Sequence, residues 1–256
     1  MVRRSPSESA ELEALINMAS QAKQLGAHDM DHMDGAAGAF NSIRIADLVA
    51  SHCASLDPQS PILDWGCGYG QVSWLLQQRG VNVISYDVER RPARESIPRL
   101  NSVKVDYGLD PVALPYDSGS LSAVLSVGVL EHVPDIDGSL KEVNRVLRPQ
   151  GCFFLFMFPN LYSWAEWIAD RRGISVHPRK FTVRETSSLL RSHAFQVETK
   201  WRRNFLPRNL TGFPARAKAA YGRFYRQIEA IDRILANIPP TSYFSGVLEF
   251  VARKHE

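Results

Sequence analysis

Short apolar runs alternate with amphipathic stretches through the middle of the chain. The apolar runs lack a polar alternation, which is typical of strands that are covered on both faces. They predict strands at residues 61–65, 81–87, 102–106, 121–127 and 152–158. Helical periodicity between them predicts helices at residues 71–78, 91–97 and 138–147. Strands that alternate with helices in this way indicate βαβ units and a parallel sheet.

Helical and strand patterns continue on both sides of this alternating core. Before it, helices are predicted at residues 10–24 and 40–52, separated by a flexible turn at the Gly-Ala-Ala-Gly-Ala segment, residues 35–39. After it, residues 182–193 predict a helix in which Thr182 and Glu185 form a capping box. The last strands are predicted at residues 195–201 and 246–253.

One further helix is predicted between the last two strands. Apolar residues from Ala217 to Ile238 recur at alternating intervals of four and three, which predicts a single amphipathic helix that ends before Pro239. This helix can pack on the rest of the protein, form the seam of a homodimer or lie on a membrane. The pattern leaves the three alternatives, and therefore the oligomeric state, open.

The order of elements predicts an α/β fold with a doubly wound, Rossmann-like sheet. We expect residues 1–52 to form an N-terminal helical lid and residues 53–256 to form the main domain, with insertions at about 159–181 and 202–244. Ligands bind outside the carboxyl ends of the strands in such folds, so these segments should cap that edge. The acceptor pocket is therefore expected to be aromatic, with arginines nearby: Trp164, Trp167, Phe205, Tyr243 and Phe244.

Composition excludes several other classes of protein. A length of 256 residues fits one large α/β domain. The longest dense apolar run, residues 153–158, is far shorter than the roughly 20 residues of a membrane span. No apolar stretch follows Arg3 and Arg4, so a secretory signal is not expected. Three cysteines form neither a disulfide framework nor a zinc motif, and a cytoplasmic location is expected.

The net charge of +3 conceals an asymmetry along the chain. Residues 160–256 contain 17 Lys and Arg against 8 Asp and Glu, whereas residues 1–159 contain 13 against 19. The basic part favours contact with an acidic acceptor or a membrane surface, and a solvated basic face is the alternative. The arginines are scattered rather than aligned in a stripe, so nucleic acid is disfavoured as a partner.

A glycine-rich turn stands between the first predicted strand of the core and the helix after it. Its sequence is Leu63-Asp64-Trp65-Gly66-Cys67-Gly68-Tyr69-Gly70. Such a turn brings backbone N–H groups and a helix N-terminus close to a nucleotide ligand. The dinucleotide fingerprint needs a third glycine where this chain has Gln71, which disfavours a nicotinamide cofactor.

The turn resembles motif I of the class I S-adenosylmethionine-dependent methyltransferases of the type 11-like family, Leu-Asp-x-Gly-x-Gly-x-Gly. Four more segments resemble the family in the expected order: Tyr86-Asp87-Val88, the stretch from Asp110 to Leu114-Pro115-Tyr116, Val129-Leu130-Glu131-His132-Val133, and the stretch from Glu142 to Gly151, where Gln150 replaces a glycine. The resemblance covers about residues 60–200 and the last strand. It implies a seven-stranded, mostly parallel sheet with one antiparallel strand near its edge, and S-adenosylmethionine as the cofactor.

The resemblance also implies which residues bind the cofactor. Asp87 would accept hydrogen bonds from the ribose, and Asp110, rather than its competitor Asp106, from the adenine amino group. Asp64 would anchor the turn near the amino acid part of the cofactor, while Arg44 would meet its carboxylate or else be a surface arginine. The other expected cofactor-binding residues are Gly66, Cys67, Gly68, Gly70, Val88 and Val127. Cys67 is expected to have no redox or nucleophilic role.

The acceptor is less well defined by the sequence. Methyl transfer needs the nucleophile aligned at ~3 Å from the methyl group in a dry site, and a hydroxyl nucleophile is helped by a base. His132 and His177 are the candidate catalytic residues, although each can instead be structural. We expect transfer to a hydroxyl of a small sugar, aryl compound or natural-product intermediate. The alternatives are N- or C-methylation and a non-catalytic cofactor-binding partner subunit.

A metal-dependent variant is considered and not expected. Some relatives bind a divalent ion through Glu-x-x-Glu-His, but Gly128 occupies the first of these positions here. Glu131 and His132 remain, with His177 as a third ligand. Hard divalent cations take more oxygen ligands than this set supplies.

Overall fold

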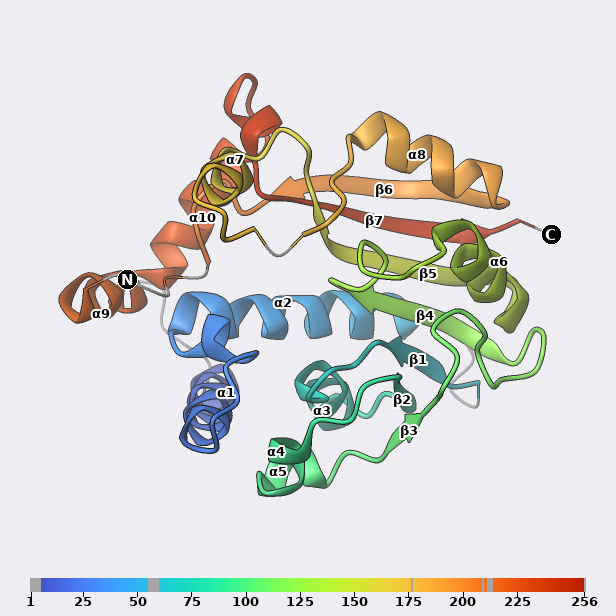
Figure 1. Ribbon diagram of the computed structural model, residues 1–256, viewed down its shortest axis with the longest axis horizontal. Coiled ribbons are helices and arrows are strands. Elements are labelled where there is room, and N and C mark those ends of the chain that lie inside the picture. Colours follow the sequence, from blue (N-terminus) through green and yellow to red (C-terminus); the bar gives the residue numbers. More distant parts are fainter. Residues whose placement is uncertain (1–5, 55–59, 176, 209, 211–213, 256) are drawn as a thin grey trace.

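A seven-stranded sheet runs through the centre of the molecule in the order β3-β2-β1-β4-β5-β7-β6. The computed structural model describes residues 6–54, 60–175, 177–208, 210 and 214–255 (Figure 1). The strands are β1 (Ile62–Trp65), β2 (Val83–Asp87), β3 (Val105–Tyr107), β4 (Leu121–Val127), β5 (Leu147–Pro159), β6 (Phe195–Arg203) and β7 (Val247–Lys254). Only β7 runs antiparallel to its neighbours, β5 and β6, among the described strands. The predicted doubly wound sheet is confirmed.

Alternate side chains of the central strands belong to two hydrophobic layers. Phe154 and Phe156 of β5 pack in one layer with α2 (Ala36–Cys53) and α3 (Gln71–Gln78). Phe153 and Leu155 belong to the other layer, together with α6 (Ile136–Val146) and α8 (Val183–Ser192). All four β5 side chains are completely buried. Coverage on both faces explains why the strand sequences show no polar alternation.

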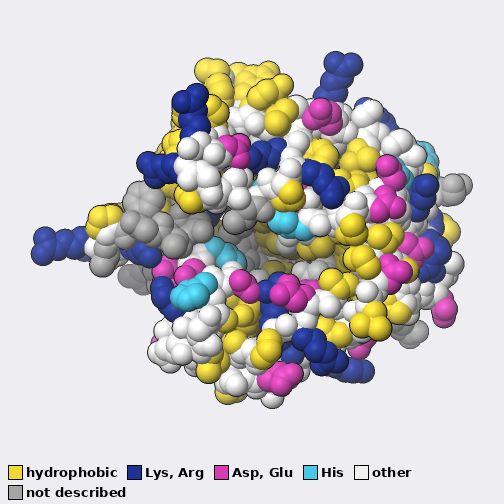
Figure 2. Space-filling view, in the orientation of Figure 1, with side chains coloured by type: hydrophobic (Ala, Val, Ile, Leu, Met, Phe, Trp, Pro, Cys, Tyr) yellow, Lys and Arg dark blue, Asp and Glu magenta, His cyan; other side chains and the backbone are white. Residues whose placement is uncertain are grey.

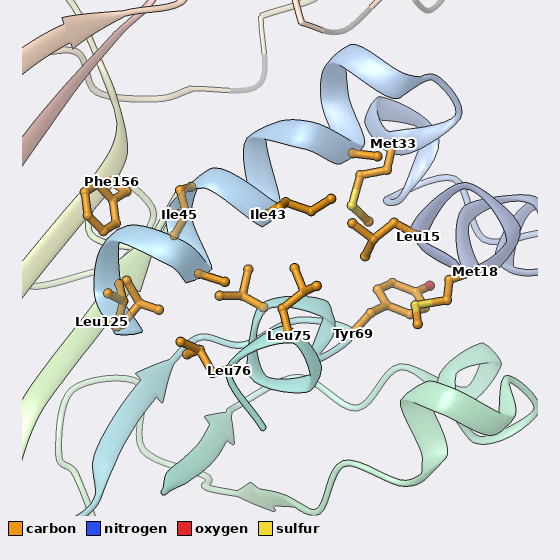
Figure 3. Packing of buried hydrophobic residues seen from close by; sticks show 14 of the residues in the cluster. Leu15, Met18, Met33, Ile43, Ile45, Tyr69, Leu75, Leu76, Leu125 and Phe156 are labelled. Carbon is orange, nitrogen blue, oxygen red and sulfur yellow. The ribbon is translucent and has the colours of Figure 1, made fainter. Parts of the chain in front are cut away.

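The N-terminal helices extend the first of these layers. Figure 3 shows Leu15 and Met18 of α1 (Pro6–Gln24) packed beside Met33, Tyr69 and Leu75. The 3-10 helix η1 (Asp31–Met33) joins α1 to α2. The predicted flexible turn at residues 35–39 is wrong, because α2 begins at Ala36. Alanine favours the helix, and burial of this first turn of α2 stabilises it further. The role of residues 1–52 as a lid remains a prediction.

Two other predicted helices are divided in the structure. The helix predicted at residues 91–97 is replaced by α4 (Pro92–Glu95) and α5 (Pro98–Asn101). Pro98 starts the second because proline lacks the N–H that would continue the first. The predicted long helix from Ala217 to Ile238 is likewise two helices, α9 (Ala215–Arg223) and α10 (Tyr225–Leu235). The chain turns at Phe224, and Tyr225 is buried against Phe40 with ring centroids 5.2 Å apart.

The insertions predicted at about residues 159–181 and 202–244, which we call the cap, contain α7 (Trp164–Arg171) and the 3-10 helix η2 (Thr241–Phe244). Their role in covering the acceptor remains a prediction. The capping box of α8 is confirmed, since the Thr182 hydroxyl accepts from the Glu185 N–H and the Glu185 carboxylate accepts from the Thr182 N–H.

None of the helices in the described ranges has both the length and the apolar character needed to cross a bilayer.

Candidate functional site: the cleft at the carboxyl ends of the strands

A cleft of about 1080 Å³ opens where β1, β2 and β4 end. The cap contributes Ser163, Ala165 and Glu166 of the α7 segment to its lining, and His28 and His32 from the connection between α1 and α2 lie on the opposite side. Figure 2 shows this face of the molecule hollowed, with histidine side chains at the edge. A smaller hollow of about 180 Å³ lies on the glycine turn.

The glycine turn is shaped by three residues with left-handed backbone conformations. Gly66, Gly68 and Gly70 have φ values of 68°, 57° and 84°. A Cβ on Gly66 would lie 2.6 Å from a methyl group of Val129, so no larger residue fits. At Gly68 an added Cβ would have only the Arg91 Nε nearby, at 3.9 Å, so this backbone borders open space. The turn therefore fits a ligand that approaches the backbone N–H groups before α3.

Asp64 lies beneath the turn and lines the smaller hollow. Its carboxylate is buried and accepts a hydrogen bond of 2.6 Å from the Ser73 hydroxyl. Burial raises the pKa of Asp64 to about 6, and the nearby Asp87 acts in the same direction. The residue is thus placed both to fix the turn and to face a ligand in the hollow.

Asp87 connects the turn to the larger cleft. Its Oδ2 accepts from the Gly68 N–H at 2.7 Å, and its Oδ1 accepts from the Glu89 N–H at 2.9 Å. Val88, next in the chain, is half exposed in the same cleft. A buried carboxylate beside an exposed apolar side chain suits a nucleoside, whose ribose and base present hydroxyls and a flat face.

Two other predicted cofactor residues lie at the smaller hollow. Val127 and Cys67 both line it beside Gly66. Burial raises the pKa of the Cys67 thiol, which keeps it protonated and unreactive at neutral pH. This agrees with a packing role for Cys67 in the turn.

The structure does not bring Asp110 and Arg44 to the lining of either cavity. Asp110 is exposed and accepts hydrogen bonds from the N–H groups of Ala113 and Val112, which lower its pKa. Arg44 donates from two nitrogens to Glu249 and also to Asn41. Their predicted contacts with adenine and with the cofactor carboxylate remain predictions.

Two histidines and two carboxylates gather at the cap side of the cleft. The Nδ1 of His177 lies 2.9 Å from the Oε1 of Glu166, and the rings of His177 and His132 are 5.8 Å apart. Glu131 is completely buried, and neither of its carboxylate oxygens has a hydrogen-bond partner among the described residues. The Nε2 of His132 is 3.9 Å from the nearer of those oxygens.

The surroundings move the pKa values of these groups in different directions. Burial raises the pKa of Glu131 to about 7. Burial lowers the pKa of His132, and the neighbouring His177 and Arg179 lower it further. The hydrogen bond with Glu166 raises the pKa of His177. At neutral pH His132 is therefore neutral and able to accept a proton, whereas His177 is biased toward its charged form.

The same cluster could hold a metal ion. A carboxylate oxygen of Glu131 and one ring nitrogen from each of His132 and His177 lie within 4.8 Å of one another. Two imidazole nitrogens and a carboxylate suit a transition metal better than magnesium or calcium.

The expected aromatic lining is wrong for the described cleft, because its lining residues do not include Trp164, Trp167, Phe205, Tyr243 or Phe244. Sequence reasoning also missed several residues that do line it. Met157 and Asn204 both have left-handed φ values, 59° and 60°. Met157 lies at a register shift between β5 and β7, and its sulfur accepts from the amide groups of Asn41 and Asn204. Glu166 was also missed as the partner of His177. A bulge and a pairing of this kind depend on neighbouring elements and leave no local pattern in the sequence.

Arg91, which sequence reasoning also missed, connects the N-terminal segment to the rim of the site. It forms ion pairs with Asp29 and Glu89 and lies 5.5 Å from the ring centre of Tyr69. Asp29, Glu89 and Arg91 all line the larger cleft. The connection between α1 and α2 is thereby held against the loop that follows β2.

Comparison with known proteins identifies the family. Residues 63–155 match the family model of the methyltransferase domain. The chain is 33% identical over 175 residues to the ubiquinone biosynthesis O-methyltransferase of Xanthomonas campestris pv. campestris, covering 62% of this chain and 71% of the relative.

Solved structures show the same fold. A chain in the solved complex of the Haloferax volcanii Trm112 methyltransferase activator is 17% identical, with a TM-score of 0.59 over 96% of this chain and 97% of its own. The Burkholderia thailandensis 1,6-didemethyltoxoflavin-N1-methyltransferase with bound S-adenosylhomocysteine is 20% identical, with a TM-score of 0.56 over 100% and 93%. The glycine turn, the buried Asp87 and these similarities agree, and the chain belongs to the class I S-adenosylmethionine-dependent methyltransferases of the type 11 family, with S-adenosylmethionine as its cofactor.

Proposed function

We propose that the protein transfers the methyl group of S-adenosylmethionine to a hydroxyl of a small-molecule acceptor, such as a sugar, an aryl compound or a natural-product intermediate. The observation that carries this proposal is the placement of His132 and His177 in the same cleft as Gly66 and Asp87. A proton acceptor beside the cofactor turn is what a hydroxyl nucleophile needs. The 33% identical Xanthomonas relative is named as an O-methyltransferase, which supports transfer to oxygen.

On the cofactor side, the residues of the turn and of β2 would contact different parts of S-adenosylmethionine. Asp64, Gly66, Cys67, Gly68 and Gly70 would hold the amino acid part of the cofactor. Asp87 and Val88 would hold the ribose and adenine, with Val127 beneath, and Asp110 and Arg44 remain proposed contacts. When bound, S-adenosylmethionine supplies a methyl group on a positively charged sulfur that is a good leaving group.

On the acceptor side, the two histidines have different proposed roles. His132 takes the proton of the acceptor hydroxyl, because its lowered pKa keeps the ring neutral at the pH of the cell. His177, held by Glu166, positions the acceptor through its other ring nitrogen.

A test begins with the cofactor and continues with the acceptor. Thermal unfolding is measured with S-adenosylhomocysteine, S-adenosylmethionine and NAD in separate samples. A ligand at ~100 times its dissociation constant adds ~2.7 kcal/mol, which raises the midpoint by roughly 5–10 °C in a protein of this size. We expect a shift with the two sulfur nucleotides alone. Transfer of a labelled methyl group to panels of phenols, sugars and amines then identifies the methylated atom.

Two alternatives make different predictions in the same assays. An N- or C-methyltransferase would label amines or carbon acids instead, and the Burkholderia neighbour is named as an N1-methyltransferase. A non-catalytic partner subunit would bind S-adenosylhomocysteine without transferring methyl groups, and the Haloferax neighbour is found with an activator.

The oligomeric state and the location are separate questions. Gel filtration with light scattering would distinguish a monomer from a homodimer. Because Cys53, Cys67 and Cys152 are free thiols, we propose a reducing cytoplasm as the location.

A second candidate is metal-assisted methyl transfer, although the sequence predicted no metal. It is favoured by one observation, the two unpartnered and buried oxygens of Glu131 within reach of two imidazoles. An ion at this place would lower the pKa of an acceptor hydroxyl without a protein base. Elemental analysis of the purified protein, with activity measured after chelation and after metal is restored, separates the two candidates.

A further inference from the structure

The cap carries an apolar surface that the methyl-transfer site does not use. Among the described residues, thirteen large hydrophobic side chains are exposed, and ten of them lie between residues 161 and 244. These ten are Leu161, Tyr162, Trp167, Ile174, Phe224, Ile231, Ile234, Ile238, Tyr243 and Phe244. Single exposed apolar side chains are ordinary, whereas such a concentration indicates a contact surface.

Most of these side chains come from segments that adjoin one another. The Asn160 side chain donates to the carbonyl oxygen of Tyr243 at 2.8 Å, which joins the start of the α7 segment to η2. The Thr241 hydroxyl donates to the carbonyl oxygens of Leu235 and Ile238, which joins η2 to the end of α10. Figure 1 shows α7 beside the turn after α10, and Figure 2 shows hydrophobic side chains gathered over this region. We call Leu161, Tyr162, Trp167, Ile174, Ile234, Ile238, Tyr243 and Phe244 the cap patch.

Arginines are interleaved with the aromatic rings of the cap patch. The Arg171 guanidinium lies 4.2 Å from the ring centre of Trp167, and that of Arg202 lies 4.9 Å from the ring centre of Tyr243. Arg172 and Arg233 are exposed in the same segments. Within residues 161–174 and 224–244, all of them described, Asp170 is the only exposed acidic residue, and it is paired with Lys180 at 2.5 Å.

We propose that the cap patch docks the protein on an anionic lipid bilayer. Tryptophan and tyrosine have an apolar body and a polar tip, which suits the boundary between headgroups and acyl chains. Exposed arginines beside them are attracted to anionic headgroups. A second copy of the chain is a poorer occupant, because a two-fold interface would place the patch against itself and bring its arginines together.

Docking in this way would place the acceptor cleft beside the bilayer. Ala165 and Glu166 line the cleft from the same helix that carries Trp167, and Gly246 lines it two residues after Phe244. If the proposed methyl transfer is correct, acceptors with an apolar tail could enter from the membrane. The docking itself does not depend on that function and is tested by binding alone.

The experiment measures co-sedimentation of the full chain with vesicles of phosphatidylcholine, with or without phosphatidylglycerol. We expect the affinity for the anionic vesicles to be higher by at least about tenfold and to fall as salt is added. The double variants Trp167→Ser/Phe244→Ser and Arg171→Glu/Arg172→Glu should each lower this affinity by at least about tenfold. The matched controls, Leu109→Ser and Arg99→Glu/Lys104→Glu, change exposed residues elsewhere and should bind as the parent does.

The thermal shift caused by S-adenosylhomocysteine, measured for every variant, shows that the fold and the cofactor site are intact. It also separates a failure of the docking proposal from a failure of the proposed enzyme function. The docking proposal is overturned if the parent protein does not sediment with anionic vesicles, or if the control variants lose as much affinity as the patch variants. It is equally overturned if the patch variants keep full vesicle affinity but dissociate a dimer in analytical ultracentrifugation.

Discussion

Glu166 holds His177 through a contact of 2.9 Å between its Oε1 and the Nδ1 of the ring. Both residues belong to the cap, whereas His132 follows β4 of the sheet. Because Nδ1 is engaged by Glu166, the other ring nitrogen of His177 is the one available to His132 and to an acceptor. The acid–base cluster is thus assembled only when the cap lies on the sheet.

The Glu166–His177 pair predicts a pH-dependent contribution to stability. Its hydrogen bond raises the pKa of His177 above 6.5 in the folded protein. Such a group stabilises the fold fully below its unfolded pKa, and this stabilisation is lost as the pH rises through the folded pKa. We expect Glu166→Gln to destabilise the protein more at about pH 5.5 than at about pH 9, measured by urea unfolding. Glu13→Gln, an exposed change in α1, serves as the control, and an equal loss at both pH values would contradict the prediction.

The histidines of the cluster should be required for turnover but not for cofactor binding. We expect His132→Ala and His177→Ala each to lower the methyl-transfer rate by ~10²-fold or more once an acceptor is known. The lowered pKa of His132 predicts that kcat/KM falls only as the pH drops below 6.5, where the ring takes up a proton. If neither substitution lowers turnover to that extent, general-base catalysis by these residues is wrong.

Asp87 should be needed to bind the cofactor. Its carboxylate carries the hydrogen bonds of the Gly68 and Glu89 N–H groups and lines the cleft. In the proposed complex the ribose hydroxyls donate to this carboxylate, and hydrogen bonds to a charged group contribute ~1.5–3 kcal/mol each. We therefore expect Asp87→Ala to weaken the binding of S-adenosylhomocysteine by ~10²-fold, measured by isothermal titration calorimetry. Asp117→Asn, an exposed change elsewhere, should leave the affinity unchanged. An unchanged affinity for Asp87→Ala would rule out the ribose assignment.

Arg44 and Glu249 should be coupled in stability. Glu249 is 1% exposed and Arg44 is bound to it by two nitrogens, so removal of either residue leaves a buried charge. We expect Arg44→Leu to cost about 3–5 kcal/mol, whereas Arg44→Leu combined with Glu249→Leu should cost less. Urea unfolding of the two single variants and the double variant measures the coupling. The affinity of Arg44→Leu for S-adenosylhomocysteine separately tests the predicted contact with the cofactor carboxylate.

Gly38 should tolerate no side chain. A Cβ at this position of α2 would lie 1.8 Å from the carbonyl oxygen of His32. Gly38→Ala must therefore displace the segment that contains Asp29 and His32, which both line the cleft. The substitution should lower both Tm and cofactor affinity. Gly222→Ala in α9 meets no atom within 4 Å and should instead stabilise by up to ~1 kcal/mol. Equal effects of the two substitutions in a thermal scan would show that the close approach is absent.

Elements with a local signal were predicted well. The limits of α3 and β4 agree with the sequence prediction, and Thr182 and Glu185 form the predicted capping box. The first turn of α2 and the break at Phe224 were not predicted. In the first turn of α2, burial adds to the helix preference of the alanines. The break at Phe224 depends on a distant contact, the packing of Tyr225 on Phe40, which outweighs the local pattern.

The sequence by itself determined the order of the strands along the chain, the glycine turn and the position of Asp87 at the end of β2. Hydrophobic periodicity, backbone freedom at glycine and hydrogen bonds between near neighbours act over a few residues and are therefore visible in the chain. Only the tertiary structure decided that Arg44 pairs with Glu249, 205 residues away, and that Met157 faces the cleft from a bulge in β5. Such contacts arise when separate elements pack together, and no short segment encodes them.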